Sequence, residues 1–164
     1  MEKPFIDAVV AFSFGRPANI RPNQVIANEA VRLAQKYGAP IVTQRDVPLE
    51  NRICVEFIDA IGEMNQSHVS TFKVVQRFAK LAQEHDWKKV LVVAAPGYLW
   101  RCVRDLEKLS FVVWVSDCMN KHPSNIWFCK NSTQWWTRNY FAFWMREICI
   151  RLTPWWLYKK IAGD

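Results

Sequence analysis

The chain has 164 residues and a net charge of +7, and hydrophobic and charged residues make up 51% and 23% of it. These values are typical of one soluble globular domain over residues 1–164. No apolar run reaches the roughly 18 residues that a membrane-spanning helix needs, and residues 1–7 lack the apolar core of a signal peptide, so we expect a cytoplasmic protein.

The first part of the chain predicts two strands with a helix between them. Residues 6–14 form an apolar run that predicts a buried strand. Residues 22–37 have apolar side chains at helical spacing, and Gly38 is a typical residue to end that helix. Residues 39–43 predict a second strand, which the polar residues 44–46 follow directly.

The middle of the chain predicts two further helices. Residues 53–61 have apolar side chains at helical spacing, and residues 64–69 are short and irregular, consistent with a small strand. Ser70 and Thr71 are typical residues to cap the next helix, which we expect to end near residue 86.

A strand, a tight turn and a helix then occupy residues 90–109. The apolar run 90–95 is closed by Pro96-Gly97, and helical spacing follows from Tyr98 onward. Such a run predicts a strand buried on both faces. Residues 111–115 predict one more strand.

The last part of the chain is basic and rich in tryptophan. Residues 118–164 contain seven basic and two acidic residues and six of the nine tryptophans. We expect a polar loop at 117–131, a long helix at 132–151 and a short helix at 154–161. Residues 132–164 are therefore expected to be a helical segment that packs on the domain.

The alternation of strands with helices favours an α/β fold with a mainly parallel sheet. Helices on both faces of the sheet give a three-layer α/β/α Rossmann-like sandwich. Ligands of such folds bind in the crevice outside the carboxyl ends of the strands.

Common catalytic and metal-binding motifs are absent. The sequence has no Gly-x-Gly-x-x-Gly, no Gly-x4-Gly-Lys-Ser/Thr and no Gly-x-Ser-x-Gly segment. Its three histidines are scattered, so we expect no metal site. Its five cysteines form no Cys-x-x-Cys pair, which predicts reduced thiols.

Polar residues nevertheless follow or precede the elements that should meet at one sheet edge. Because helix N-termini at that edge offer free N–H groups and a positive dipole end, we expect a small anionic or nucleotide-like ligand there. The candidate ligand-binding residues are Ser13, Gly15, Arg16, Asn19, Thr43, Gln44, Arg45, Ser70, Thr71, Tyr98 and Arg101.

Several of these residues also have ordinary structural interpretations. Ser70 and Thr71 are typical helix caps, and Arg16 and Arg45 are typical solvated loop charges. Only the convergence of several loops favours a ligand site over these alternatives.

Tyr98 and Arg101 have two interpretations each. Near a helix N-terminus, Arg101 can donate to a phosphate or carboxylate, and Tyr98 can donate its hydroxyl or stack on a base. Alternatively, Arg101 pairs with Asp105 one turn further on, and Tyr98 belongs to the core.

The span from Ser67 to Val115 resembles the ElyC/SanA/YdcF family of bacterial proteins. The resemblance depends on Ser70-Thr71 opening a helix, on Trp87-Lys88-Lys89-Val90 leading into a strand, and on Arg101 in the next helix. The helix ending Leu33 to Pro40 is also similar to its counterpart in the family.

This resemblance implies a Rossmann-like fold and S-adenosylmethionine or another adenine-containing ligand as the cofactor. It also implies a cytoplasmic protein or one peripheral to the inner membrane. The chain departs from the family pattern at Ala94, Tyr98 and Val74, where the family has threonine, histidine and asparagine. The turn after the second strand, at residues 44–46, also departs from it.

The Trp-rich segment suggests an alternative function of a different class. Aromatic and basic side chains together are typical of surfaces that contact membranes or partner proteins. On this interpretation, Trp155, Trp156, Lys159 and Lys160 contact a membrane surface or a protein, in a non-enzymatic module. Nucleic acid is a poor partner, because the basic residues form no dense cluster.

The tryptophans also have a plain structural interpretation. The aromatic residues of the predicted long helix, Trp136, Tyr140, Phe143 and Trp144, can simply face the sheet as core.

Overall fold

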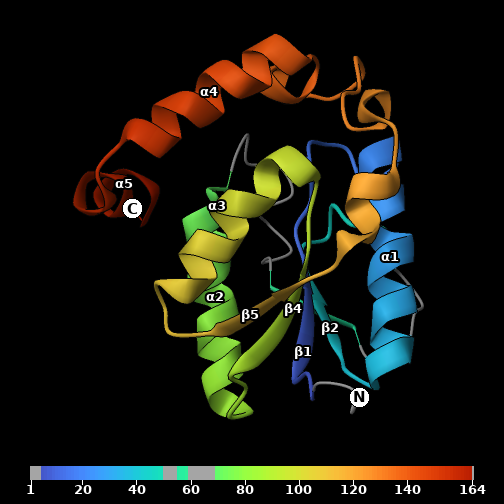
Figure 1. Cartoon of the computed structure of the whole chain (residues 1–164), viewed down its shortest axis with the longest axis vertical. Helices are drawn as coiled ribbons and strands as arrows, with labels where there is room; N and C mark the ends of the chain where they lie inside the picture. The colour runs from blue at the N-terminus through green and yellow to red at the C-terminus, as the bar shows by residue number, and fades with distance from the viewer. Residues whose placement is uncertain (1–4, 50–54, 59–68, 164) are drawn as a thin grey trace.

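The computed structural model describes residues 5–49, 55–58 and 69–163 (Figure 1). Within these residues the strands are β1 (Ala8–Ala11), β2 (Ile41–Thr43), β3 (Val55–Phe57), β4 (Lys89–Val93) and β5 (Val112–Val115). The α-helices are α1 (Arg21–Tyr37), α2 (Thr71–Glu84), α3 (Pro96–Glu107), α4 (Tyr140–Leu152) and α5 (Trp155–Gly163). Short 3-10 helices are η2 (Asp117–Lys121), η3 (Ser124–Ile126) and η4 (Trp135–Thr137).

The five strands form one parallel sheet in the order β3-β2-β1-β4-β5. Helix α1 covers one face, and α2 and α3 cover the other (Figure 1). The predicted three-layer α/β/α Rossmann-like sandwich is confirmed. The strand order reverses direction between β1 and β4, and in such sheets this switch point is where ligands bind.

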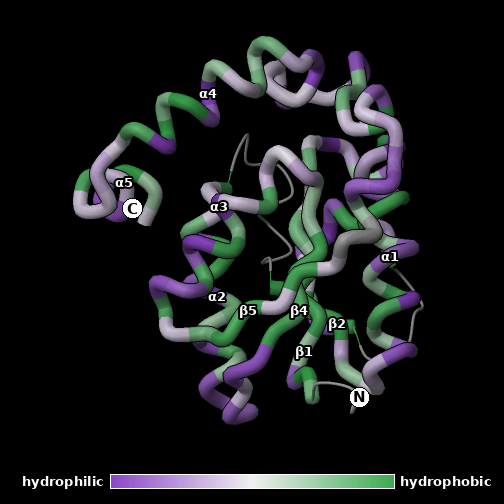
Figure 2. Tube along the Cα trace, viewed as in Figure 1, coloured by the Kyte–Doolittle hydropathy of each residue, from purple (hydrophilic) through white to green (hydrophobic). Residues whose placement is uncertain are grey.

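The central strands are buried on both faces, as their unbroken apolar runs predict. Val10 in β1 is in register with Val42 in β2 and Val92 in β4, and all three side chains are buried. Figure 2 shows the hydrophobic colour concentrated along these strands. Burial of such side chains is the main stabilising contribution to the fold.

Helix boundaries follow the residues that terminate them. Gly38 ends α1 in the left-handed conformation with a φ of 67°, which glycine adopts without the steric cost of a Cβ. The Ser70 side chain caps α2 by accepting a hydrogen bond from the backbone N–H of Lys73. The predicted helices α1 and α2 are confirmed, as is helix α3, which begins at Pro96.

The helix predicted at residues 53–61 is wrong for the described part of that range. Residues 55–57 form strand β3, which pairs with β2 through Val55 and Ile41. Val55 and Phe57 suit a half-buried strand, and pairing with β2 overrides their helical spacing. The rest of that range, and residues 64–68 of the predicted small strand, lie outside the described residues.

The long helix predicted at 132–151 begins only at Tyr140. Asn139 is its cap, and the Asn139 Oδ1 accepts a hydrogen bond of 2.8 Å from the N–H of Ala142. Residues 132–138 instead form turns and η4, because the hydroxyls of Ser132 and Thr137 bond to each other at 2.7 Å. The polar loop predicted at 117–131 contains the 3-10 helices η2 and η3.

The C-terminal helices lie beside the carboxyl edge of the sheet. Helix α4 crosses above the strand ends, and α5 lies near α2 (Figure 1). The rings of Phe72 in α2 and Trp155 in α5 meet edge to face at 5.3 Å. Among the described residues, no helix has the length and apolarity needed to cross a membrane.

The cysteines that can be assessed are free thiols. Cys102 is buried, Cys129 is half-buried and Cys149 is exposed. The structure joins none of these three in a disulfide, and their redox state stays a prediction. Cys54 and the side chain of Cys118 lie outside the described part of the chain.

Candidate functional site

A hollow of about 440 Å³, counting the part open to solvent, lies at the carboxyl ends of β1 and β4. The loop after β1, the loop after β2, the start of α3 and the C-terminal segment all contribute side chains to it. Its lining residues are Ser13, Phe14, Gly15, Arg16, Gln44, Asp46, Val69, Tyr98, Gln134, Trp136, Thr137 and Phe143. The hollow therefore occupies the switch point where ligands of this fold class bind.

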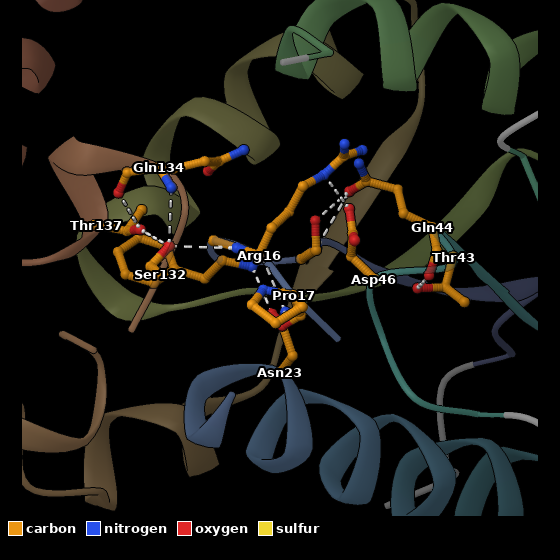
Figure 3. Close-up of polar contacts among 12 residues, drawn as sticks. Arg16, Pro17, Asn23, Thr43, Gln44, Asp46, Ser132, Gln134 and Thr137 are labelled. Carbon is orange, nitrogen blue, oxygen red and sulfur yellow. Dashed lines mark hydrogen bonds and ion pairs between the residues drawn. The ribbon is translucent and has the colours of Figure 1, made fainter. Parts of the chain in front are cut away.

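The loop after β1 is held in place by Asn23 in the first turn of α1. Its Oδ1 accepts a hydrogen bond of 2.8 Å from the N–H of Phe14, and its Nδ2 donates to the carbonyl of Gly15 at 3.0 Å (Figure 3). Asn23 is fully buried. In the sequence Asn23 is one residue of the helix predicted at 22–37, and nothing about its position there predicts that it holds the preceding loop.

Arg16 forms an ion pair inside the hollow. Its Nε lies 2.7 Å from the Oδ2 of Asp46, and both side chains are largely buried (Figure 3). Burial raises the pKa of the Asp46 carboxyl, and the Arg16 guanidinium opposes that shift. The positive charge predicted at this position is therefore present, but a carboxylate that we did not place in the site accompanies it.

Gln44 links the loops that follow β1 and β2. Its Oε1 accepts hydrogen bonds from the Ser13 N–H at 3.2 Å and from the Ser13 hydroxyl at 3.1 Å. Both residues line the hollow, as predicted from their places after two strands. Neighbouring Thr43 is buried and donates to the Ala11 carbonyl at 2.8 Å, so its role is to join β2 to β1.

The C-terminal segment lines one side of the hollow with Gln134, Trp136 and Thr137, and Ser132 anchors it to the loop after β1. The Ser132 Oγ accepts hydrogen bonds from the N–H groups of Arg16, at 3.3 Å, and Gln134, at 3.2 Å (Figure 3). In return, the N–H of Thr133 donates to the Arg16 carbonyl at 2.9 Å. Segment 132–137 is thus fixed to the loop after β1 by backbone and hydroxyl groups.

Gly15 makes this close approach possible. Its φ is +86°, and a Cβ at this position would lie 2.7 Å from both the Ser132 Oγ and the Thr137 Oγ1. Any other residue would be strained in its backbone and would displace the two hydroxyls. Gly15 therefore belongs to the site through the contact that it permits.

Tyr98 reaches the hollow from the first turn of α3. Its hydroxyl lies 2.8 Å from the Oγ1 of Thr71, and its ring contacts Phe14 and Phe12. Burial raises the pKa of Tyr98 well above its ordinary value, so the phenol is neutral. The core interpretation of Tyr98 is confirmed, and one side of the residue also lines the hollow.

Arg101 does not line the hollow. Its guanidinium is buried and lies 2.8 Å from the Oε1 of Glu147 in α4. Asp105, the partner expected in the alternative interpretation, instead contacts Arg104 at 2.6 Å and accepts a hydrogen bond of 2.7 Å from the Tyr158 hydroxyl. Arg101 therefore joins α3 to α4, which neither sequence interpretation anticipated.

The structure thus brings five of the predicted site residues to the hollow and leaves the others outside it. Those that line it are Ser13, Gly15, Arg16, Gln44 and Tyr98. The residues that do not line it are Asn19, Thr43, Arg45, Ser70, Thr71 and Arg101.

Two of the residues outside the hollow make structural contacts elsewhere. Ser70 caps α2 and also donates its hydroxyl to the Ala162 carbonyl of α5. Arg45 lies over the Phe57 ring at 4.9 Å.

The residues that sequence reasoning missed come chiefly from the C-terminal segment. Gln134, Trp136 and Thr137 line the hollow from a stretch more than 100 residues away from β1 in the sequence. No local signal identifies such residues, because only the fold returns this stretch to the sheet edge. Asp46 had a signal, since it follows β2 within the predicted loop.

Among the described residues, no three His, Cys, Asp or Glu side chains are grouped closely enough to hold a metal ion.

Comparison with models of known protein families, with curated proteins and with solved structures finds no match to this chain. The chemistry of the hollow itself is therefore the basis for a functional proposal.

Proposed function

We propose that the protein binds a small nucleotide-like ligand in the hollow at the switch point between β1 and β4. The observation that carries this proposal is the lining, which combines aromatic rings with polar groups from four separate parts of the chain. Pockets for small molecules are typically apolar and aromatic, with a few polar groups that fix orientation.

The aromatic part of the lining suits a flat ring. Trp136 and Phe143 approach from the C-terminal segment, and Phe14 and Tyr98 approach from the sheet side. Phe143, Phe14 and Tyr98 are only 2%, 4% and 8% exposed, so a base would stack on the half-buried Trp136. Stacking of this kind stabilises a base by about 1–3 kcal/mol. An adenine ring, which the family resemblance implies, is a flat aromatic ring that can stack in this way.

The polar part of the lining suits a sugar with an anionic group. The Arg16 guanidinium, which Asp46 pairs with in the structure, can donate to a ligand phosphate or carboxylate in its place. Ser13 and Gln44 supply further polar groups beside this ion pair. S-adenosylmethionine and adenine nucleotides both contain this combination of ring, sugar and charge.

These groups support binding rather than a chemical step. Tyr98 is neutral because burial raises its pKa, so it is not a base, and its hydroxyl is hydrogen-bonded to that of Thr71. Cys102 on α3 is wholly buried, and burial raises the pKa of its thiol well above the ordinary value. A protonated buried thiol is not a nucleophile.

Isothermal titration of the full chain with AMP, ATP and S-adenosyl compounds tests the proposal. We expect saturable binding of at least one of them, weakened about tenfold or more in Trp136→Leu. A matched control is Trp114→Leu, because Trp114 lies in β5 and outside the hollow. Absence of binding by the wild-type protein, or equal weakening by both substitutions, would contradict the proposal.

A further inference from the structure

Helix α4 has an apolar face turned to solvent in addition to the face that contacts the protein. Phe141, Met145, Ile148 and Leu152 are 74%, 50%, 48% and 78% exposed. Their spacing of four, three and four residues places them in one stripe along the helix. We refer to these four residues as the α4 stripe.

The opposite side of α4 packs against the rest of the domain. Phe143 and Glu147 are buried there, and Glu147 pairs with Arg101 of α3. This attachment leaves the α4 stripe pointing away from the domain. Over its 13 residues the helix is about 20 Å long, so it presents an extended apolar ridge without any change of fold.

Exposed apolar side chains continue beyond α4. Trp156 and Ile161 in α5 are 70% and 71% exposed. Trp155, in contrast, packs on Phe72 and Tyr158. The membrane or partner contact expected of the tryptophan pair is therefore available to Trp156 but not to Trp155.

The exposed charged side chains of residues 118–163, the part of this segment that the structure describes, are all basic. Between residues 118 and 163 the sequence has one acidic residue, Glu147, and it is fully buried. The basic residues flanking the α4 stripe and Trp156 are exposed: Arg138, Arg151, Lys159 and Lys160. Asp164, the other acidic residue of this segment, lies outside the described residues. An apolar stripe flanked by exposed cations, with no exposed anion among residues 118–163, is complementary to a negatively charged lipid surface.

We propose that α4 and α5 dock the protein on an anionic lipid surface, with the α4 stripe and Trp156 entering the interfacial region. A second copy of the chain fits less well, because a twofold-symmetric contact would bring the same basic residues to face one another. Anionic headgroups would neutralise these residues. This inference concerns a surface separate from the ligand hollow and does not depend on it.

Co-sedimentation of the full chain with lipid vesicles tests the inference. We expect binding to vesicles of phosphatidylcholine mixed with phosphatidylglycerol, weaker binding to phosphatidylcholine alone, and release by high salt. Phe141→Glu should weaken binding on the order of tenfold or more. Its matched control is Phe5→Glu, since Phe5 is 73% exposed at the other end of the chain.

Charge is tested by a second matched pair of variants. Lys159→Gln combined with Lys160→Gln should weaken binding to the anionic vesicles on the order of 30-fold, at about fivefold for each lysine. Lys88→Gln combined with Lys89→Gln, an adjacent exposed pair distant from α5, should change it little. Urea midpoints of all four variants should match the wild type.

Three outcomes would overturn the inference. One is that the wild-type protein does not sediment with the anionic vesicles. Another is that the paired variants weaken binding equally. The third is a dimer in gel filtration that Phe141→Glu converts to a monomer while no vesicles are bound, which would assign the α4 stripe to self-association.

Discussion

The guanidinium of Arg101 in α3 lies 2.8 Å from the carboxylate of Glu147 in α4, and the two side chains are only 5% and 0% exposed. Burial raises the pKa of Glu147, and Arg101 is the main group that lowers it. Arg101 is therefore the main compensation for the Glu147 charge, while Arg101 itself contacts both Glu147 and the Tyr98 ring, whose centroid is 4.7 Å away. This pair fixes which side of α4 faces the domain and which side faces solvent.

Arg101→Met should destabilise the protein strongly at neutral pH. The substitution leaves the Glu147 carboxylate buried without its nearest cation, and loss of one partner from a buried ion pair costs about 3–5 kcal/mol. The double variant Arg101→Met with Glu147→Leu should recover much of the loss, because neither charge remains. Urea unfolding measures all three proteins, and Asp86→Asn, which removes an exposed ion pair with Lys88, should have little effect.

The pH dependence of the stability of Arg101→Met tests whether the unpaired Glu147 carboxylate causes the loss of stability. Without Arg101, burial raises the Glu147 pKa in the folded state above its ordinary value of 4.5. At Glu147 the folded state then binds more protons than the unfolded state, so the contribution of this residue to the free energy of unfolding is largest below pH 4.5 and is lost as the pH rises through the folded pKa. The difference in stability between wild type and variant should therefore widen as the pH rises. A loss of stability that is the same at all pH values would contradict this explanation.

Gly15→Ala should destabilise the protein more than Gly38→Ala does. Both glycines have positive φ angles, +86° and +67°, so both alanines carry backbone strain. At Gly15 the new Cβ would also lie 2.7 Å from two hydroxyls, whereas at Gly38 nothing lies within 4 Å. We expect about 1 kcal/mol for Gly38→Ala and at least 1 kcal/mol more for Gly15→Ala. Equal urea midpoints would show that segment 132–137 is not held closely against Gly15.

The sequence predicts the sheet because its signals are local. The apolar runs around β1 and β4 and the terminators Gly38 and Pro96 depend on neighbouring residues alone. Strand β3 was mistaken for a helix, since three residues give too short a pattern to distinguish the two periods. Its pairing with β2, a tertiary contact, decides the structure.

The candidate site is predictable only where it is built from strand ends. Ser13, Arg16 and Gln44 follow β1 and β2 directly, and topology alone brings them to one edge. The partners Glu147 and Ser132 come from the C-terminal segment, and no spacing rule connects them with α3 or with Gly15. The role of Arg101 therefore depends on a contact that spans 46 residues and cannot be derived from its position at a helix start.

Tyr158→Phe should destabilise the attachment of α5. The Tyr158 hydroxyl donates a 2.7 Å hydrogen bond to the fully buried Asp105 carboxylate, and burial already raises the pKa of Asp105. Removing the donor leaves this carboxylate with less compensation, which costs about 1–3 kcal/mol. Tyr140→Phe is the matched control because Tyr140 is exposed. Similar thermal unfolding temperatures for the two variants would contradict the importance of this bond.

Asp46→Asn and Arg16→Gln should change nucleotide affinity in opposite directions if the proposed function is correct. The Asp46 carboxylate lies 2.7 Å from the Arg16 guanidinium and competes with any ligand anion for it. Removing the negative charge should therefore strengthen binding of AMP several-fold, and removing the positive charge should weaken it about tenfold or more, since a charge-assisted hydrogen bond is worth about 1.5–3 kcal/mol.

Adenosine, which lacks the phosphate, should respond little to Arg16→Gln. Titration of both compounds measures the difference, with Arg45→Gln as the control because Arg45 lies outside the hollow. Equal changes for AMP and adenosine would place the phosphate away from Arg16, and weaker AMP binding in Asp46→Asn would show that Asp46 positions Arg16 rather than competing for it.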